Sequence, residues 1–299
     1  MLSIQLTILI LVATGFGVTK AGVFSAKARA DMTNVVIYVV MPCNIFTSFH
    51  KGISPEVLRQ CLVVLLAASG LQVLYIILNK VLYKWIVPER RIVVQYATIV
   101  NNASFMGLPI IGSVFGEIGV LYGAIVLIPM RIFMWTAGLS LYTKTDNKKK
   151  IKTIATHPCI LSVIIGFAYI FAPFELPGFL SNAISAIGGC TTALSMIIVG
   201  SILSGVDPKR FLEKECLYYS FFRLILIPAV LFGALKLLRA DALTIGAVVL
   251  SSAMPAAATT AMLSEKYGKD SEFATKIIFT STIISMITLP LISEVLTRV

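Results

Sequence analysis

Apolar runs long enough to cross a bilayer follow one another along the whole chain. A bilayer core of about 30 Å requires roughly 20 apolar residues per helical span, and the sequence contains ten candidate runs. They are residues 2–18, 32–49, 57–78, 92–115, 118–141, 156–172, 180–203, 216–237, 242–263 and 273–296. Because only 13% of the 299 residues are charged and the mean hydropathy is +0.92, the sequence predicts an all-α integral membrane protein with ten transmembrane helices.

Lysine and arginine are concentrated in alternate connections between these runs. Most of the 25 Lys and Arg residues follow the first, third, fifth, seventh and ninth runs. By the positive-inside rule these connections face the cytoplasm, so both termini are expected on the extracytoplasmic side of the cell membrane (plasma or inner membrane). This topology accounts for the net charge of +11, and we expect the lipid bilayer rather than nucleic acid as the partner.

The two halves of the chain resemble each other at an offset of about 152 residues. "GISP" at Gly52 matches "GVDP" at Gly205, and "FGEIG" at Phe115 matches "YGKDS" at Tyr267. A basic linker at residues 144–155 separates a first half, 1–143, from a second half, 156–299. Since each half holds five runs, the second would cross the membrane in the opposite sense, which is the inverted repeat of many secondary transporters. Chance matches among Gly- and Pro-rich membrane segments are the alternative.

Ser54 and Asp207 suit the N-cap of a helix, and each precedes a proline that suits the first helical position. Both would begin the third helix of a half.

Two polar or proline-containing stretches occupy corresponding places in the fourth run of each half. These are "VNNASFMGLP" at residues 100–109 and "LSSAMPAAATT" at residues 250–260. Pro255 removes a backbone donor, while Gly107 and Pro109 weaken a helix. Freed backbone groups are tolerated at membrane depth only where protein or a water-filled cavity satisfies them. Paired interruptions of this kind indicate a transporter's binding site.

The polar side chains near these interruptions have two interpretations each. Asn101 and Asn102 would bind substrate or staple helices together. Asn44 with Pro42, in "MPCNIF", would belong to a site or to a simple kink. Arg131 would hold a carboxylate or bond the loosened carbonyls of a broken helix. The candidate substrate-binding residues are Asn44, Asn101, Asn102, Ser104, Arg131, Pro255 and Thr259, and the candidate helix-breaking residues are Pro42, Gly107, Pro109 and Pro255.

Charged residues are otherwise scarce inside the runs. Arg223 is nearer the cytoplasmic end of the eighth run, where we expect it to snorkel to the interface. No Asp or Glu lies in the middle of any run, and no HExxH, P-loop or GxSxG motif occurs. The sequence therefore predicts no metal site, no cofactor and no enzymatic activity.

Three stretches together resemble the auxin efflux carrier family. "NNASFMGLP", "MPCNIF" and "AMPAAATTAMLSEKYG" are similar to segments of that family, which includes the plant PIN-FORMED proteins and bacterial permeases for small carboxylates. The resemblance covers the whole chain, and the short central loop is closer to the compact bacterial type.

The resemblance implies a fold like that of bile-acid symporters and sodium–proton antiporters, in which broken spans 4 and 9 cross at the substrate. Spans 1, 2, 6 and 7 would form a dimerising scaffold, and spans 3–5 and 8–10 an elevator-like transport domain. Asn101 or Asn102 would bind the substrate carboxylate, and Pro255 would mark the second crossing.

These observations lead to the expectation of a homodimeric secondary transporter, an efflux permease for small organic anions such as auxin-like or other carboxylates. Exporting one negative charge gains about 2.3 kcal/mol per 100 mV of inside-negative potential, so efflux would need no coupling ion. The alternative is sodium- or proton-coupled uptake of a carboxylate on the same fold. A ligand sensor that binds without transport is a further alternative.

Overall fold

The computed structural model describes residues 2–47, 54–142, 156, 158–172, 174–205, 213–257 and 259–298. These residues form helices and connections, with no β-strand among them. Six helices are long and apolar enough to cross a membrane: Lys27–Thr47, Pro55–Asn79, Ala103–Gly138, Gly178–Ser201, Lys214–Leu237 and Ser271–Thr297. Three more, Ile10–Lys20, Pro158–Ile170 and Ala242–Ser252, are apolar but shorter. The prediction of an all-helical, multi-pass membrane protein is confirmed. The predicted linker at 144–155 and the predicted N-cap Asp207 lie outside the described residues.

The helices of the first half are interrupted by short π-helical turns, labelled η. The elements of this half, in order, are α1 (Leu2–Lys20), α2 (Ala26–Val35), η1 (Val36–Val40), α3 (Met41–Thr47), α4 (Pro55–Asn79), α5 (Pro88–Ile99), η2 (Ala103–Gly107), α6 (Leu108–Phe133) and η3 (Met134–Gly138). The second half contains α8 (Pro158–Ile170), α9 (Gly178–Gly189), α10 (Thr191–Ser204), α11 (Lys214–Phe221), η5 (Phe222–Leu226), α12 (Ile227–Leu237), α13 (Ala242–Ser252), α14 (Thr259–Lys266) and α15 (Ser271–Thr297).

Local sequence signals account for several of these boundaries. Ser54 caps α4, where its side chain accepts a hydrogen bond from the Val57 N–H at 3.3 Å, and Pro55 is the first helical residue as predicted. Gly116 turns the chain inside α6 with φ 66° and ψ −156°. This conformation strains residues that carry a Cβ. It divides α6 into two helices that meet at the glycine.

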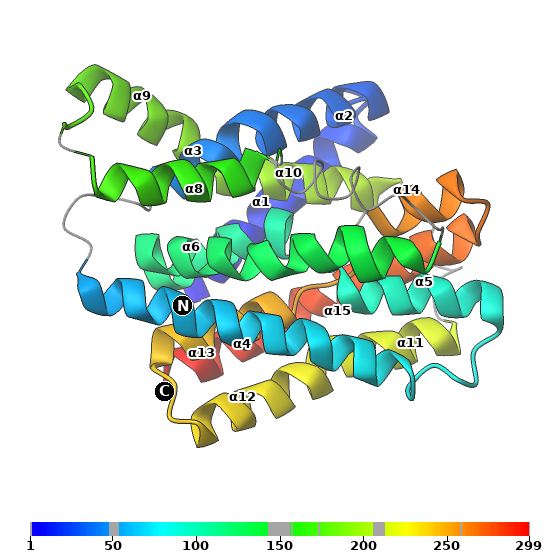
Figure 1. Cartoon of the computed structure of the whole chain (residues 1–299). Coiled ribbons are helices and arrows are strands. Elements are labelled where there is room, and N and C mark those ends of the chain that lie inside the picture. The colour runs from blue at the N-terminus through cyan, green and yellow to red at the C-terminus, as the bar shows by residue number, and fades with distance from the viewer. Residues whose placement is uncertain are drawn as a thin grey trace.

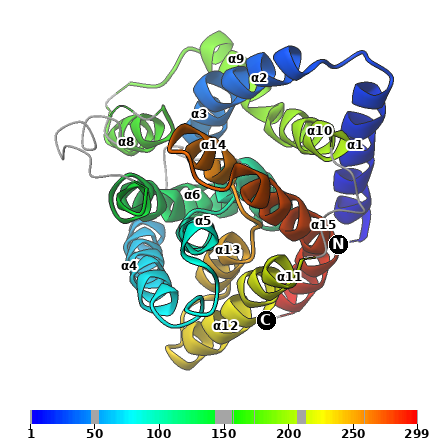
Figure 2. The ribbon, with the colours of Figure 1, turned by 90° about the vertical axis from the view of Figure 1, so that its right-hand side faces the viewer.

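The helices form two groups that each combine elements from both halves of the chain (Figure 1). The first group contains α1–α3 and α8–α10, with α1 packed on α10 and α3 packed on α8 and α9. The second group contains α4–α6 and α11–α15, with α6 packed on α4 and α13, and α15 packed on α11, α13 and α14. Figure 2, which looks roughly along the helices, separates the two groups.

Two glycines allow α1 and α10 to approach closely. A Cβ at Gly15 would overlap the backbone of Ile197, and a Cβ at Gly200 would overlap the carbonyl of Val12. Small residues at such contacts bring helix backbones together in membranes, where dispersion contacts rather than water exclusion hold helices. The α1–α10 pair therefore depends on these two glycines.

We expect Gly15→Ala to lower the thermal-unfolding midpoint of the purified protein, because overpacking of this kind costs about 1–3 kcal/mol. Gly17→Ala, in the same helix with nothing within 4 Å of its added Cβ, is the matched control and should leave the midpoint unchanged or raise it. Equal midpoints for the two variants would show that the close contact contributes nothing to stability.

Arg223 lies in the interior rather than at the interface. It is 1% exposed, and its Cζ atom lies 4.5 Å from the centroid of the Tyr75 ring on α4. Tyr219, one helical turn earlier, is also fully buried. The expectation that Arg223 snorkels was wrong because α11 and η5 present this face to α4 and not to lipid.

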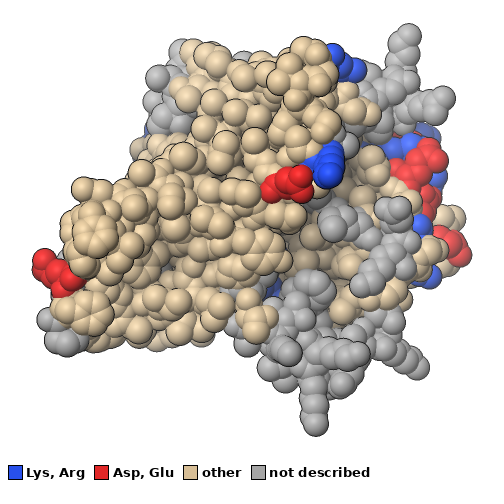
Figure 3. Space-filling view, turned by 90° about the horizontal axis from the view of Figure 1, so that it is seen from above, with Lys and Arg blue, Asp and Glu red and all other residues tan. Residues whose placement is uncertain are grey.

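An ion-pair cluster joins the starts of α5, α11 and α15. The Arg90 Nη1 lies 2.7 Å from the Glu213 Oε2 and 3.4 Å from the Glu215 Oε1, and the Arg90 Nε lies 3.2 Å from the Asp270 Oδ2. Lys276 lies 2.6 Å from Glu213. In Figure 3 the charged side chains gather mainly on the right-hand side, the side on which these helices begin in Figure 1, beside a wide uncharged surface.

Lys276 and then Arg90 hold the pKa of Glu213 below its ordinary value of 4.5. Because the folded state lowers this pKa, the carboxylate stabilises the fold above pH 4.5 and loses that contribution as the pH falls through the lowered value.

We therefore expect Glu213→Gln to lower the unfolding midpoint at pH 7, with a difference from the wild type that shrinks as the pH falls below 4.5. Glu272→Gln, whose side chain is 77% exposed, should have a smaller effect because solvent screens exposed pairs. A Glu213→Gln difference that does not change with pH would contradict this account.

Candidate functional site

Two interrupted helices lie side by side in the interior of the second group. The chain leaves α5 after Ile99 and enters η2 at Ala103, and it leaves α13 after Ser252 and enters α14 at Thr259. Asn101 and Ala256 form an isolated antiparallel bridge. The Asn102 N–H donates to the Pro255 carbonyl at 2.8 Å. The two interruptions therefore satisfy part of each other's backbone hydrogen bonding.

Asn101 repairs the hydrogen bond that a proline removes. In an α-helix the Ser251 carbonyl would accept from the N–H of residue 255, but Pro255 has no N–H. The Asn101 Nδ2 donates to the Ser251 carbonyl instead. The Asn101 Oδ1 accepts from the Ala103 N–H at 3.3 Å. Asn101 is 5% exposed, and its carboxamide is engaged at both ends.

Asn102 differs from its neighbour. Its backbone carbonyl accepts from the Met106 N–H at 2.9 Å, which starts η2. Its half-buried side chain makes no hydrogen bond within the part of the chain that the structure describes. The Asn102 carboxamide is therefore available for a ligand.

Arg131 and Ser104 are brought together from α6 and η2. The Arg131 Nη2 donates to the Ser104 Oγ at 2.7 Å, and its Nη1 lies 3.6 Å from the Met134 Sδ. Its Nε is buried without a partner. Among the described residues, no carboxylate lies within 4.0 Å of this guanidinium. Arg131 also bonds no backbone carbonyl there, so the helix-repair interpretation of this residue does not hold.

Thr259 begins α14 on the other side of the second interruption. The Tyr96 hydroxyl donates to the Thr259 Oγ1 at 3.3 Å. The neighbouring Thr260 is fully buried, and its hydroxyl has no partner among the described residues. The Tyr96–Thr259 bond joins α5 to the start of α14.

Gly107 and Pro109 have roles other than breaking a helix. Gly107 ends η2, and a Cβ there would lie 3.2 Å from the Met254 Cγ, so this glycine permits the close approach of the two interruptions. Pro109 is the second residue of α6, which continues directly from η2, so this proline lies inside a continuous helix and does not end it. The first interruption centres on residues 100–102, before both of them.

Asn44 lies in a separate cavity of about 270 Å³ between the two groups of helices. Its wall combines Asn44 from α3, Pro109 and Ser113 from α6, and Thr192 from α10. Pro42 is the second residue of α3 and follows η1, where the helix continues. The structure thus brings Asn101, Asn102 and Pro255 together and Ser104 and Arg131 together, while Asn44 lines the cavity between the two groups.

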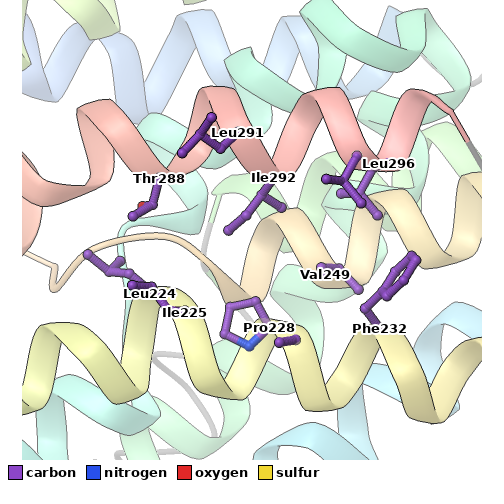
Figure 4. A pocket seen from close by; sticks show the side chains of 11 residues that line it. Leu224, Ile225, Pro228, Phe232, Val249, Thr288, Leu291, Ile292 and Leu296 are labelled. Carbon is purple, nitrogen blue, oxygen red and sulfur yellow. The ribbon is translucent and has the colours of Figure 1, made fainter.

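An apolar crevice between η5, α12, α13 and α15 has different chemistry (Figure 4). Its volume is about 330 Å³, and Thr288 supplies its only side-chain hydroxyl among apolar residues that include Leu224, Phe232 and Leu291. Without amides or cations in its wall, this crevice is unsuited to an anion.

Two residues that form hydrogen bonds at the site were not predicted from the sequence. The Ser281 Oγ on α15 accepts from the Ala256 N–H at 3.2 Å, and Tyr96 bonds Thr259. A serine in an apolar helix usually bonds its own backbone, so no sequence signal indicates Ser281. Tyr96 lies one turn before the asparagines, which is a weak signal.

The sequence pattern of one protein family, described as "Membrane transport protein", matches residues 3–293. The chain belongs to this family. The family consists of transporters rather than enzymes, and the resemblance to the auxin efflux carrier family is confirmed.

Three relatives are similar to the chain. An "Uncharacterized transporter" of Methanocaldococcus jannaschii is 27% identical and matches across 97% of both chains. A second "Uncharacterized transporter", of Methanothermobacter thermautotrophicus, is 26% identical across 97% of both chains. A "Putative malonate transporter" of Rhizobium meliloti is 29% identical over 138 residues, which are 46% of this chain and 43% of that relative. The prediction of a transporter rather than an enzyme is therefore confirmed.

The different contacts of the two asparagines predict different effects on stability. Asn101→Ala would leave the Ser251 carbonyl buried without a donor, which costs about 1–3 kcal/mol, so we expect a clearly lower thermal-unfolding midpoint. Asn102→Ala removes no hydrogen bond seen among the described residues and is the matched control. A larger loss of stability in Asn102→Ala than in Asn101→Ala would reverse the assignment.

Proposed function

We propose that the protein is a secondary transporter that moves small organic anions, with the substrate bound where the two interrupted helices cross. One observation carries the proposal. Arg131, bonded to Ser104 two residues from the free Asn102 carboxamide, has no carboxylate partner among the described residues. An intramembrane arginine without a counter-charge marks a functional site, and a guanidinium binds a carboxylate strongly through paired hydrogen bonds.

Each residue of the site has a distinct role in this proposal. Arg131 pairs with a substrate carboxylate, and Ser104 fixes the guanidinium. Asn102 donates its side-chain amide to the substrate, while Asn101 and Pro255 hold the crossing together. Thr259 presents its hydroxyl from the start of α14, where the helix dipole also favours an anion. Asn44 lines the cavity through which the substrate would approach between the two groups of helices.

The proposed architecture has ten spans arranged as two inverted repeats of five. Gly116 and Gly268 both adopt positive φ, 66° and 61°, and they are 152 residues apart. At the same offset the interruption after α5 corresponds to the one after α13, and η1 corresponds to the junction of α9 and α10. These correspondences support a repeat, and the odd number of spans per half would invert it.

The division into two helix groups supports an elevator mechanism. The group of α4–α6 and α11–α15 contains the crossing and would move as the transport domain. The group of α1–α3 and α8–α10 would remain fixed as the scaffold of a homodimer. We further propose that both termini are extracytoplasmic in the cell membrane and that residues 144–155 form a cytoplasmic linker.

The charge of the substrate bears on the direction of transport and on its coupling to ions. We favour efflux, since an inside-negative potential drives anions outward. The alternative is sodium- or proton-coupled uptake on the same fold. Flux into proteoliposomes with sodium and pH gradients clamped in turn separates the two: uptake that requires either gradient would favour coupling.

The site assignment predicts losses of substrate affinity that are larger than losses of stability. Counterflow of a carboxylate panel that includes malonate and indole-3-acetate should show KM rising about 10- to 100-fold in Arg131→Gln, since hydrogen bonds to charged groups contribute about 1.5–3 kcal/mol. Asn102→Ala should raise KM less, and Gln60→Ala, near the start of α4 where the side chain donates to Glu56, should not raise it. Normal KM values in both site variants would sink the assignment, and saturable binding without counterflow would favour a sensor.

A further inference from the structure

The only charged residues deep in the predicted spans are two arginines. Arg131 and Arg223 are the two of 25 Lys and Arg residues that lie within the spans and away from their ends, and no Asp or Glu lies in the middle of any span. Both belong to the second group of helices, on α6 and η5. The substrate site proposed above uses Arg131 and leaves Arg223 without a role.

The surroundings of Arg223 do not neutralise its charge. The Tyr75 ring covers the guanidinium at 4.5 Å, and Gln72 lies one turn earlier on α4. Within the described residues, the Arg223 Nε and Nη1, the Tyr75 hydroxyl and the Gln72 Oε1 are buried without hydrogen-bond partners. A cation–π contact offsets part of the cost of burial but leaves the formal charge in a region of low dielectric constant.

Arg223 is close enough to the crossing for its field to reach a bound anion. Tyr219, one turn before Arg223, donates its hydroxyl to the Ala97 carbonyl at 2.9 Å, and Ala97 lies one turn before Asn101. Because α5 and α11 begin at the same end, both turns run in the same direction, and the separation is mainly the lateral one between neighbouring helices and their side chains, roughly 15 Å. At that separation and an effective dielectric constant of about 20, Coulomb's law gives about a sixfold change in affinity per unit of ligand charge.

We propose that Arg223 is a specificity-determining residue, a second fixed positive charge that makes the site prefer a dianion, such as a small dicarboxylate, over a monoanion. This inference rests on the proposed transport function. A dianion would also bring the net charge of the site with Arg131 and Arg223 to zero, which lowers the cost of holding charge at membrane depth. Arg223 acts through its field and does not touch the substrate.

The test compares two ligands of one skeleton that differ by one charge. Counterflow of malonate and of monomethyl malonate, and of succinate and its monomethyl ester, gives a ratio of kcat/KM for dianion over monoanion. In Arg223→Met this ratio should fall about sixfold, whereas Arg223→Lys keeps the charge and should keep the ratio. Tyr75→Leu disturbs the same packing without changing charge and should affect both ligands alike.

A ratio in Arg223→Met equal to that of the wild type, with both ligands still transported, would overturn the inference. Arg223→Gln provides a second neutral variant of different shape if Arg223→Met does not fold. A wild-type protein that transports neither these compounds nor any other member of the carboxylate panel would instead defeat the proposed function, so the two failures are distinguishable.

Discussion

The hydrogen bond from the Asn101 side chain to the Ser251 carbonyl is the interaction on which the interior of this protein depends. At membrane depth every backbone group must find a partner within the protein, and Pro255 deprives Ser251 of one. Asn101 supplies the missing donor, the Asn102 N–H satisfies the Pro255 carbonyl, and Ser281 accepts from the Ala256 N–H. Polar backbone can therefore remain in the interior without unfolding either helix.

As a result, two neighbouring asparagines have different roles: the side chain of one holds the backbone together, and the side chain of the other is left for a ligand. Asn101 is occupied on both ends of its carboxamide, while the carboxamide of Asn102 is free among the described residues. The charges are divided in a similar way. Arg90 and Lys276 at the helix starts are matched by carboxylates, whereas Arg131 and Arg223 have none nearby in the described part of the chain. The arginine and lysine that pair with carboxylates join helices, whereas the two arginines without carboxylate partners can act on a ligand, by contact or through their field.

Much of this could be predicted from the sequence, because interruptions of apolar runs have local causes. Proline and adjacent asparagines cannot sit in lipid without compensation, so the stretches around Asn101 and Pro255 were identifiable. The identity of each partner was not, because Ser251 lies 150 residues from Asn101. Arg223 was misjudged because hydropathy records how many apolar residues surround a charge but not whether α4 or lipid covers it. The π-helical turns also leave no mark in a nearly uniform apolar pattern.

The turn η1 has a consequence for how Asn44 reaches its cavity. The Met41 N–H bonds the Val36 carbonyl five residues earlier, so this turn accommodates one residue more than an α-helix would. Each residue of an α-helix advances the direction of the side chains by about 100°. Deleting a single residue from η1 would restore a regular helix and swing all of α3 around its axis. The extra residue in η1 therefore decides that Asn44, and not a neighbouring side chain of α3, faces the space between the two groups.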